Sequence, residues 1–363
     1  MPTALNPLNP LATTALIVAL DEHRVITDHS TREIYSHDET PKHCLPLAVV
    51  FPRSHDEVVA IMHIAIEYGI TLIARGAGSG NVGGALPSVQ SIVVSFECMN
   101  QILEFHPEDR YIVVQAGMVT AEIDRIAREH GLFYPPDPGS AAYSRIGGNL
   151  AMNAAGPRAV KYGVTRDYVM GLRAVTGAGN SISSGCRTRK GVMGYDLTRL
   201  LVGSEGTLAL ITAATLKLLP LPEAKVTLRV CYASNAEACR AVSRVMNQSI
   251  VPCALEFMDS FSIRAIQAAG SATDLPAGTQ ALLMVEADGA ADDLPRQIHA
   301  LKLALTGTGM LDLQIASDQR TIAALWVARK ALSHAVKKIA PLKINEDVVV
   351  PVSRLAELVI HIE

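Results

Sequence analysis

The feature that most constrains the fold is a glycine-rich loop between two predicted strands. The stretch RGAGSGNVGGALP, residues 75–87, contains a G-x-G-x-x-G motif from Gly78 to Gly83, the spacing of a dinucleotide-binding fingerprint. A Rossmann fingerprint must open a helix whose N-terminal amides receive the pyrophosphate. Here Pro87 follows closely and SIVVSF, residues 91–96, already reads as the next strand, so a crossover helix has no room. The motif therefore does not indicate a Rossmann domain.

The same loop can bind phosphate in another way. Glycines let the backbone adopt positive φ values and turn successive N–H groups toward one point, and such a nest binds an anion without a helix. A merely tight loop is the commoner origin of glycine clusters, but the flanking strands and Arg75 at the mouth favour an anion site. The candidate residues are Arg75, Gly76, Ala77, Gly78, Ser79, Gly80, Gly83 and Gly84.

Hydrophobic patterns on both sides of the loop predict an α+β domain. A helix is predicted from a capping box at Ser54 and Glu57 to a stop at Gly69. Its apolar face would comprise Val58, Ile61, Met62, Ala65 and Ile66. Strands are predicted within 45–52, 70–75, 91–96, 111–117, 167–179 and 194–220, with a helix at 119–131, whereas 183–190 shows no regular pattern.

The stretch 132–163 is rich in proline and small residues. Gly147-Gly148-Asn149 precedes a short helix lined with alanine and a second asparagine, Asn153. Small side chains let a flat ligand approach the backbone, and the two asparagine amides can hydrogen-bond its edge.

A proline-punctuated linker at 219–225 divides the chain. Beyond it, the order of predicted strands and helices is that of a split βαβ sheet, followed by a helix at 318–338, a strand at 343–351 and a final helix from Ser353. We expect an N-terminal helical segment at 1–41, one domain at 42–222 and a second at 223–363. Because the final apolar helix has no stop signal, we also expect the chain to be a fragment or an early truncation.

Composition excludes several classes of function. Lys+Arg (32) and Asp+Glu (35) nearly balance and aromatic residues make up 4%, so neither a basic nucleic-acid surface nor a base-stacking platform is indicated. The six cysteines are scattered without a C-x-x-C pair, which argues for reduced thiols in a cytoplasmic protein. The apolar run at 11–20 is too short to span a bilayer and has no positively charged region before it, unlike a signal peptide.

Five ordered motifs resemble those of the flavoprotein oxidoreductases with a vanillyl-alcohol-oxidase-type FAD fold, in particular D-lactate dehydrogenases and the FAD subunit of glycolate oxidase. They are RGAGSGNVGGALP, YPPDPGSAAYSRIGGNLAMNAAGPRAVKYGVT, GYDLTRLLVGSEGTLALIT, LEFMD and WVARKAL followed by KINEDVVVP. The resemblance runs from about Tyr35 to Glu363. It implies a two-subdomain PCMH-type FAD-binding domain followed by a ferredoxin-like α+β cap, or substrate, domain that is incomplete at the C-terminus.

The resemblance also implies where FAD binds. Backbone amides of 76–80 would hold the pyrophosphate. Residues along the flavin and ribityl chain would be Pro135, Asp137, Ser144, Gly147, Gly148, Asn149, Asn153 and Gly156, and residues near the adenine and ribose would be Glu205, Gly206 and Ile211. Relatives that attach FAD covalently through the glycine loop carry a histidine where this chain has Ser79, so non-covalent binding is implied.

For the substrate, the resemblance implies that Arg329 clamps a carboxylate, with Lys343 as a second partner. Full-length relatives continue to H-x-G-D-G-N-x-H and G-E-H-G segments, which supply metal ligands and a catalytic base. This sequence contains neither segment, so we expect no metal site; His334 and His361 lie on predicted helices, in solvated or packed roles.

The implied function is oxidation of a small D-2-hydroxy acid, of the D-lactate or glycolate type, by hydride transfer from Cα to flavin N5. A quinone, a cytochrome or an electron-transfer flavoprotein would then accept the electrons, and a homodimer or a partner subunit is left open. The expected location is the cytoplasm, including the inner-membrane surface where the electron acceptor lies. Two alternatives remain: an enzyme similar to alkylglycerone-phosphate synthase, and a non-catalytic FAD-binding subunit that works with a partner chain.

Overall fold

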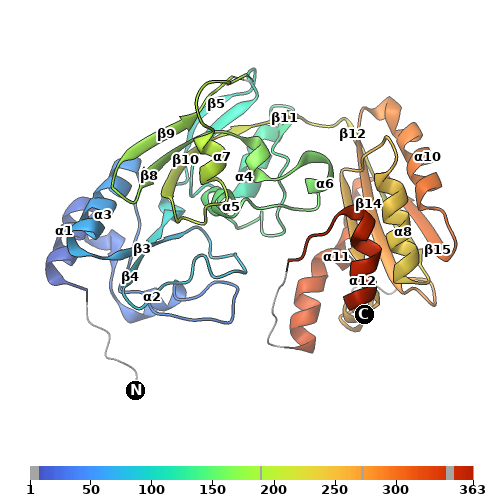
Figure 1. The fold of residues 1–363 in the computed structure, drawn as a ribbon, viewed down its shortest axis with the longest axis horizontal. Coiled ribbons are helices and arrows are strands. Elements are labelled where there is room, and N and C mark those ends of the chain that lie inside the picture. The colour runs from blue at the N-terminus through green and yellow to red at the C-terminus, as the bar shows by residue number, and fades with distance from the viewer. Residues whose placement is uncertain (1–7, 189, 271–273, 341–346, 363) are drawn as a thin grey trace. The chain divides into compact units, whose positions relative to one another are not determined.

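The chain has a mixed α+β fold that divides into two compact units (Figure 1). The computed structural model describes residues 8–188, 190–270, 274–340 and 347–362. Unit 1 comprises Met1–Gly156 and Val164–Leu221, and unit 2 comprises Pro157–Gly163 and Pro222–Glu363.

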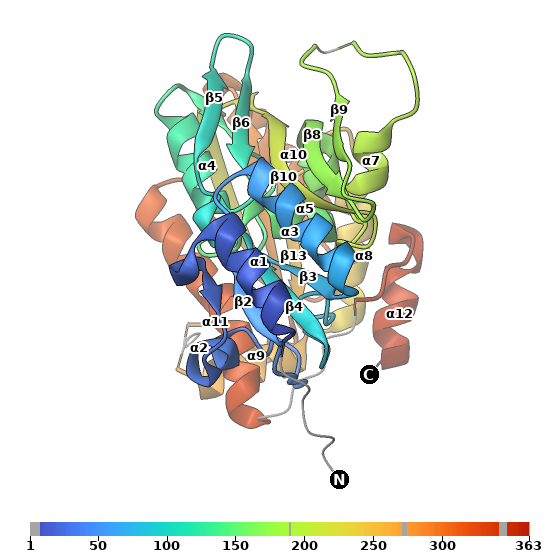
Figure 2. The same cartoon turned by 90° about the vertical axis from the view of Figure 1, so that its left-hand side faces the viewer.

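The first sheet of unit 1 has the strand order β1-β2-β4-β3, in which β2, β4 and β3 are parallel and β1 is antiparallel to β2. Two helices, α1 (Pro10–Leu20) and α3 (His55–Tyr68), lie side by side over it (Figure 2). Thus the N-terminal segment supplies a covering helix and an edge strand. The strands are β1 (Val25–Ile26), β2 (Ala48–Val50), β3 (Thr71–Arg75) and β4 (Ser91–Ser95), and α2 (His29–Ile34) joins the first two.

Helix α3 has the predicted ends but only half of the predicted capping box. The Ser54 side chain accepts from the backbone N–H of Glu57 at 3.2 Å, and Gly69 ends the helix with φ +64°. The Glu57 carboxylate instead accepts from Arg24 Nη1 at 2.6 Å and from the Arg53 backbone N–H at 2.7 Å. The predicted apolar face is buried except for Ile66, which is 50% exposed.

The second sheet of unit 1 is antiparallel, in the order β5-β6-β10-β8-β9. Its edge strand β9 corrects the sequence analysis, which found no regular pattern in 183–190. Serine and glycine there give no hydrophobic signal, and pairing with β8 supplies the strand. The strands are β5 (Ile102–His106), β6 (Tyr111–Gln115), β8 (Val169–Thr176), β9 (Ser181–Gly185) and β10 (Ala209–Lys217). The remaining elements are α4 (Thr120–Arg128), β7 (Leu132–Phe133), α5 (Ile146–Met152), α7 (Leu197–Leu201) and β11 (Leu219–Pro220).

A buried histidine joins α3 to the second sheet. His55 Nδ1 lies 2.8 Å from Thr212 Oγ1, and Nε2 lies 2.7 Å from Ser181 Oγ. Because the Thr212 hydroxyl donates to the Arg173 carbonyl oxygen at 2.9 Å, Nδ1 must carry the proton, and Ser181 donates to Nε2. Burial, and then the charge of Arg173, lower the pKa of His55 below its ordinary value, so the imidazole is neutral in the folded state.

We expect His55 to make the protein acid-sensitive. Its pKa is lower in the folded state than the unfolded value near ~6.5, so its contribution is complete above that pH and is lost as the pH falls. One such group lowers the unfolding free energy by at most about 1.4 kcal/mol per pH unit below ~6.5. In urea unfolding followed by circular dichroism, the unfolding free energy of His55→Asn should fall less steeply with decreasing pH than that of the wild type. His63→Asn, on the exposed side of the same helix, should retain the wild-type loss; an unchanged slope in His55→Asn would contradict the assignment.

Unit 2 is built on an antiparallel sheet in the order β13-β14-β12-β15, the predicted split βαβ arrangement (Figure 1). Alternate residues face opposite sides: Leu228 and Val230 pack against α8 and α10, and Cys231 and Met284 pack against α9 and α11. The strands are β12 (Ala224–Tyr232), β13 (Ala254–Met258), β14 (Ala281–Gly289) and β15 (Met310–Ala316). The helices are α6 (Ala159–Tyr162), α8 (Asn235–Met246), α9 (Ser260–Ala268), α10 (Leu294–Leu305), α11 (Gln319–Ile339) and α12 (Leu355–Ile362).

The predicted strand at 343–351 is not found where it can be checked. Residues 343–346 lie outside the described part of the chain, and 347–351 have no regular structure. None of the described helices has both the length and the hydropathy needed to cross a membrane.

Candidate functional site

The glycine-rich loop joins two parallel strands without a helix. It runs from the end of β3 to the start of β4, and residues 76–90 contain neither helix nor strand. Gly78 (φ +68°) and Gly83 (φ +86°) take the left-handed conformation that favours glycine. This connection agrees with the rejection of a Rossmann fingerprint.

Arg75, expected at the mouth of this loop, has a buried side chain that packs against Gly78. Its side chain is buried, and its Nη1 donates to the His37 carbonyl oxygen at 2.6 Å. Gly78 has φ +68°, which strains other residues, and a Cβ there would also displace the Arg75 guanidinium. Burial lowers the pKa of Arg75 relative to its ordinary value, but an arginine remains charged. The buried positive charge of Arg75 is therefore expected to attract a bound anion electrostatically, without direct contact.

The loop packs against the segment that begins α5. A Cβ on Gly76 would lie 3.2 Å from Arg145 Cβ and 3.6 Å from the Gly148 backbone nitrogen, and one on Gly84 would lie 3.6 Å from Met152 Sδ. Glycines thus allow the backbones of two segments, distant in the sequence, to approach closely. The two stretches that the sequence singled out independently lie together in unit 1.

Several predicted ligand residues have structural partners. Asn149, which is buried, donates from Nδ2 to Thr120 Oγ1 at 2.6 Å, and Ser144 accepts from the Thr120 backbone N–H through its carbonyl oxygen at 3.1 Å. Asn153 ends α5 in the left-handed conformation (φ +48°), and its Oδ1 accepts from the Arg166 backbone N–H at 2.9 Å. Asn149 Nδ2 and Asn153 Oδ1 thus bind other residues of the protein. The predicted contact of both asparagine amides with a ligand edge remains a prediction.

Two glycines in this stretch are required by close backbone approach. A Cβ on Gly156 would overlap the carbonyl oxygen of Asp137, and one on Gly147 would lie 2.8 Å from Ala116 Cβ. Gly147 N–H also donates to the Ala116 carbonyl oxygen at 2.7 Å. Both residues thus shape the site through the backbone.

The predicted G-S-E-G turn closes the C-terminal end of α5. Gly203 N–H donates to the Leu150 carbonyl oxygen at 2.9 Å, and Glu205 N–H donates to that of Ala151 at 3.0 Å. These bonds satisfy carbonyls that a helix end leaves without partners. Glu205 has φ +54°, unusual for a residue other than glycine, and the buried Ser204 Oγ has no hydrogen-bond partner among the described residues.

A pocket in unit 1 lies where these segments meet, and small residues line most of it. Six predicted residues contribute: Arg75, Gly76, Gly147, Gly148, Gly206 and Ile211. The sequence analysis missed five others: Ala74, Phe96, Ala116, Ala151 and Ala209. Four of them lie in predicted strands, where alanine and phenylalanine are typical of an ordinary core, and Ala151 lies on the short alanine-lined helix without having been named. The other predicted residues of unit 1 do not line it: Ala77, Gly78, Ser79, Gly80, Gly83, Gly84, Pro135, Asp137, Ser144, Asn149, Asn153, Gly156 and Glu205.

This pocket fits the backbone-lined part of an FAD site. Apart from its own helix backbone and chain neighbours, no atom lies within 4 Å of the place where a Cβ of Gly148 would stand, so the space beside α5 is open there. The buried Ser204 hydroxyl, which has no partner among the described residues, offers a polar contact two residues before Gly206, which lines the pocket. A second hollow shares Gly206 and Ala209 with the first, and residues of α3 including Ile66 line it.

In unit 2, the predicted substrate arginine has an acidic partner. Arg329 on α11 donates from Nε to Glu256 Oε2 on β13 at 2.5 Å, and its side chain is 37% exposed. One turn earlier on the helix, Trp326 Nε1 donates to Glu286 Oε1 at 2.7 Å. The sequence analysis placed LEFMD among family motifs but gave Glu256 no role. Lys343 lies outside the described residues.

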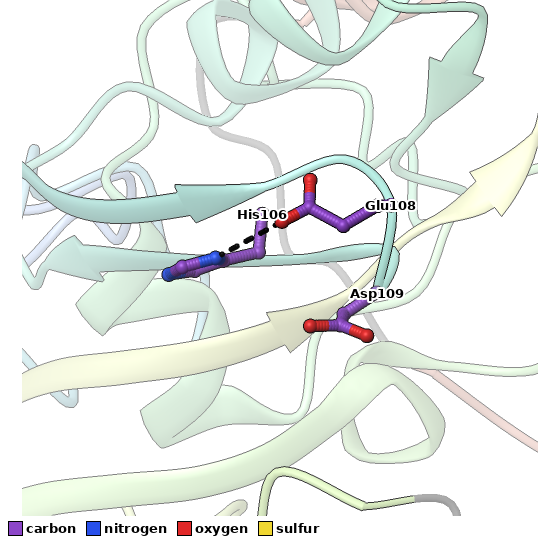
Figure 3. Close-up of side chains that lie close together, drawn as sticks. All are labelled: His106, Glu108 and Asp109. Carbon is purple, nitrogen blue, oxygen red and sulfur yellow. Dashed lines mark hydrogen bonds and ion pairs between the residues drawn. The ribbon is translucent and has the colours of Figure 1, made fainter.

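Among the described residues, one group has the composition of a metal site (Figure 3). His106, Glu108 and Asp109 lie on the β5–β6 turn, with His106 Nδ1 3.4 Å from Glu108 Oε1. Both carboxylates are exposed, and His106 also lies 3.6 Å from Glu104. Exposed groups of this kind are common without an ion, and none of these residues lines the pocket.

Comparison with known proteins agrees with this architecture. Residues 46–185 match the family described as FAD binding domain, and residues 221–363 match FAD linked oxidases, C-terminal domain. The solved structure of alkyldihydroxyacetonephosphate synthase has the same fold, with a TM-score of 0.78 at 19% identity over 93% of this chain and 67% of that one.

Three of the curated relatives are bacterial proteins. The glycolate oxidase subunit GlcD of Bacillus subtilis is 39% identical over 90% of this chain and 70% of its own length. A D-lactate dehydrogenase of Anaerostipes hadrus is 32% identical over 93% of this chain and 73% of its own length. A D-2-hydroxyglutarate dehydrogenase of Stutzerimonas stutzeri is 32% identical over 92% of this chain and 73% of its own length. With its two matched domains, this chain belongs to the FAD-linked oxidoreductase family that includes these proteins, and its cofactor is FAD.

Proposed function

We propose that the chain is an FAD-dependent dehydrogenase of a small D-2-hydroxy acid, with D-lactate and glycolate as the first candidates. The observation that carries the proposal is that relatives matching most of the chain are named for glycolate, D-lactate and D-2-hydroxyglutarate. These three compounds share a carboxylate next to a carbon that bears a hydroxyl group. Their oxidation requires a carboxylate-binding group and an acceptor for two electrons.

The residues of unit 1 hold the cofactor, without a covalent bond. Glycines of the 76–84 loop let phosphate oxygens approach the backbone amides, and Gly147, Gly148 and Ile211 line the space beyond. Bound FAD supplies the two-electron acceptor. Ser79 offers no nucleophile of the kind that a histidine provides, so acid precipitation should release all of the flavin into the supernatant.

Arg329 binds the substrate carboxylate. Its planar guanidinium presents paired N–H donors that match the two oxygens of a carboxylate, and its partial exposure leaves it accessible. Lys343 is proposed as a second partner. Reoxidation is proposed to use a quinone, a cytochrome or another flavoprotein, and one relative is named a cytochrome-linked D-lactate dehydrogenase. The proposed location remains the cytoplasm or the inner-membrane surface.

A second candidate is a partner-dependent FAD-binding subunit. The specific observation in its favour is that the Bacillus subtilis relative is named as a subunit. In that case the chain would bind FAD but need a second chain for turnover.

The visible spectrum of the FAD-loaded protein under anaerobic conditions separates these candidates. We expect the oxidised-flavin absorption to bleach on addition of D-lactate or glycolate, and L-lactate serves as the matched control for D-lactate. Bound flavin that stays oxidised with D-lactate, glycolate and D-2-hydroxyglutarate would overturn the dehydrogenase proposal and favour the subunit. A protein that cannot be loaded with FAD would contradict the proposed use of the 76–84 loop.

We expect Arg329→Ala to weaken substrate binding at least about tenfold, because an arginine–carboxylate pair is lost. Stopped-flow measurement of flavin reduction against D-lactate concentration gives the apparent dissociation constant. Arg320→Ala, near the start of the same helix, should leave that constant unchanged. Equal constants for Arg329→Ala and the wild type would remove Arg329 from the site.

A further inference from the structure

The Arg329 guanidinium is held at one edge. Its Nε donates to Glu256 Oε2 at 2.5 Å, and among the described residues this is the ion pair recorded for Arg329. The Glu256 side chain is 18% exposed, so the pair is partly shielded from water. Once Nε is bound, the other four N–H bonds of the guanidinium belong to Nη1 and Nη2. The geometry thus separates an anchored edge from a second edge that can meet another carboxylate.

A second contact fixes the helix that carries Arg329. Trp326, one turn earlier on α11, is buried and donates from Nε1 to Glu286 Oε1 at 2.7 Å. The same oxygen accepts from Thr227 Oγ1 at 2.7 Å, and Lys225 Nζ lies 3.1 Å away. The Glu286 carboxylate therefore binds donors from both α11 and β12, and it links α11 to the sheet one turn before Arg329.

The two carboxylates lie on the same face of the sheet of unit 2. In the register of β13 and β14, Ala254 pairs with Glu286 and Glu256 pairs with Met284, so the glutamates are diagonal neighbours. Each meets a donor from successive turns of α11. The strands thus hold the helix through Trp326 and the guanidinium through Arg329.

We propose that Glu256 is a positioning residue for substrate binding, which orients Arg329 so that its Nη groups receive the substrate carboxylate. This inference rests on the proposed function of Arg329. A carboxylate beside an arginine lowers the local positive charge, which by itself weakens the attraction of a substrate anion. The benefit of Glu256 must then come from geometry, because a pre-oriented guanidinium loses less freedom on binding.

Substitutions of Glu256 that separate geometry from charge should change the affinity for the substrate in opposite directions. Glu256→Gln keeps an oxygen that can accept from Nε and removes the negative charge, so binding should be as tight as in the wild type or tighter. Glu256→Asp keeps the charge but withdraws the acceptor by one methylene, so binding should weaken. Glu256→Ala removes both and should weaken binding about tenfold.

The probe is 2-hydroxyisobutyrate, which has the carboxylate and hydroxyl of a 2-hydroxy acid but no hydrogen on Cα to be removed. Its dissociation constant is measured on the FAD-loaded protein by calorimetry and by the change in the flavin spectrum. The matched control is Glu237→Ala: Glu237 also pairs with an arginine of unit 2, Arg240, and its side chain is 17% exposed. The control should leave the constant unchanged. With D-lactate, Glu256→Ala should raise KM about tenfold and change kcat little.

Failure of the inference can be told from failure of the proposed function. If Arg329→Ala weakens probe binding and Glu256→Ala does not, Glu256 has no positioning role. If Glu256→Asp binds like the wild type while Glu256→Gln loses affinity, charge rather than geometry is what matters, and the inference is overturned. If Arg329→Ala itself binds normally, the proposed carboxylate site is wrong. Fluorescence of the single tryptophan, Trp326, verifies that each variant of unit 2 is folded. If Glu256→Ala does not fold, Glu256→Gln and Glu256→Asp still test the inference.

Discussion

Replacing Gly148 by valine is expected to yield a folded protein without FAD. Gly148 lies within α5 and lines the pocket of unit 1, and apart from its own helix backbone and chain neighbours no atom lies within 4 Å of the place where its Cβ would stand. The folded protein therefore has room for the new side chain. That side chain would, however, occupy space that the cofactor needs. Gly156 is a contrasting case, because a Cβ there would overlap the Asp137 carbonyl oxygen and disturb the fold itself.

The measurement is the FAD content of the purified variant and its affinity for added FAD. We expect at least about a hundredfold loss of affinity, or about 2.7 kcal/mol, with an unchanged circular dichroism spectrum. The control is Gly177→Val, since Gly177 is exposed and has equally open space, and it lines the second hollow but not this pocket. Normal FAD content in Gly148→Val would show that the cofactor does not lie against α5.

Helix caps and hydrophobic periodicity in the sequence predicted the helices that follow these local patterns. Helix α3 begins after Ser54 and ends before Gly69, as its cap and its glycine indicate, and α11 closely follows its predicted range. The missing half of the capping box shows the limit of such signals. Glu57 binds Arg24 and the Arg53 backbone instead, and the partner Arg24 comes from a segment far away in the sequence.

The candidate site was predictable where glycine is needed for backbone conformation. Gly78, Gly147 and Gly156 are required by a positive φ or by close approach, and the sequence singled out all three. Side-chain partners were not predictable from one sequence. The burial of Arg75 against its own loop depends on the His37 carbonyl, and the Glu256–Arg329 pair depends on how α11 lies on the sheet. Both are tertiary contacts without a local pattern.

A buried carboxylate in unit 2 binds two residues of the short helix α6. Asp288 on β14 is almost fully buried, and it accepts from Tyr162 Oη at 2.8 Å while it forms an ion pair with Lys161. Lys161 also donates to the Asp288 backbone carbonyl oxygen at 3.0 Å. Burial, and then the adjacent Asp288, raise the pKa of Tyr162 above its ordinary value, so its hydroxyl stays protonated and donates. Asp288 thus holds the short helix α6 to the sheet.

We expect Asp288→Ala to lower the unfolding free energy of unit 2 by about 2–4 kcal/mol, because the ammonium of Lys161 and the hydroxyl of Tyr162 both lose their bond to this carboxylate. The Lys161 side chain is 31% exposed and can regain some water, which places the loss below that of a fully buried pair. Asp293→Ala removes a more exposed carboxylate of the same unit, which pairs with Arg296 and accepts from Gln297, and should cost less than Asp288→Ala.

Urea unfolding followed by tryptophan fluorescence measures this loss, because Trp326 is the only tryptophan of the chain and lies in the core of unit 2. A double-mutant cycle with Lys161→Met then tests the pair itself. If the ion pair holds α6, the double variant should lose less stability than the sum of the two single variants, since each single change leaves one group without its partner. Strictly additive losses would mean that Asp288 acts through Tyr162 alone, and no loss in Asp288→Ala would mean that packing, rather than this carboxylate, keeps α6 in place.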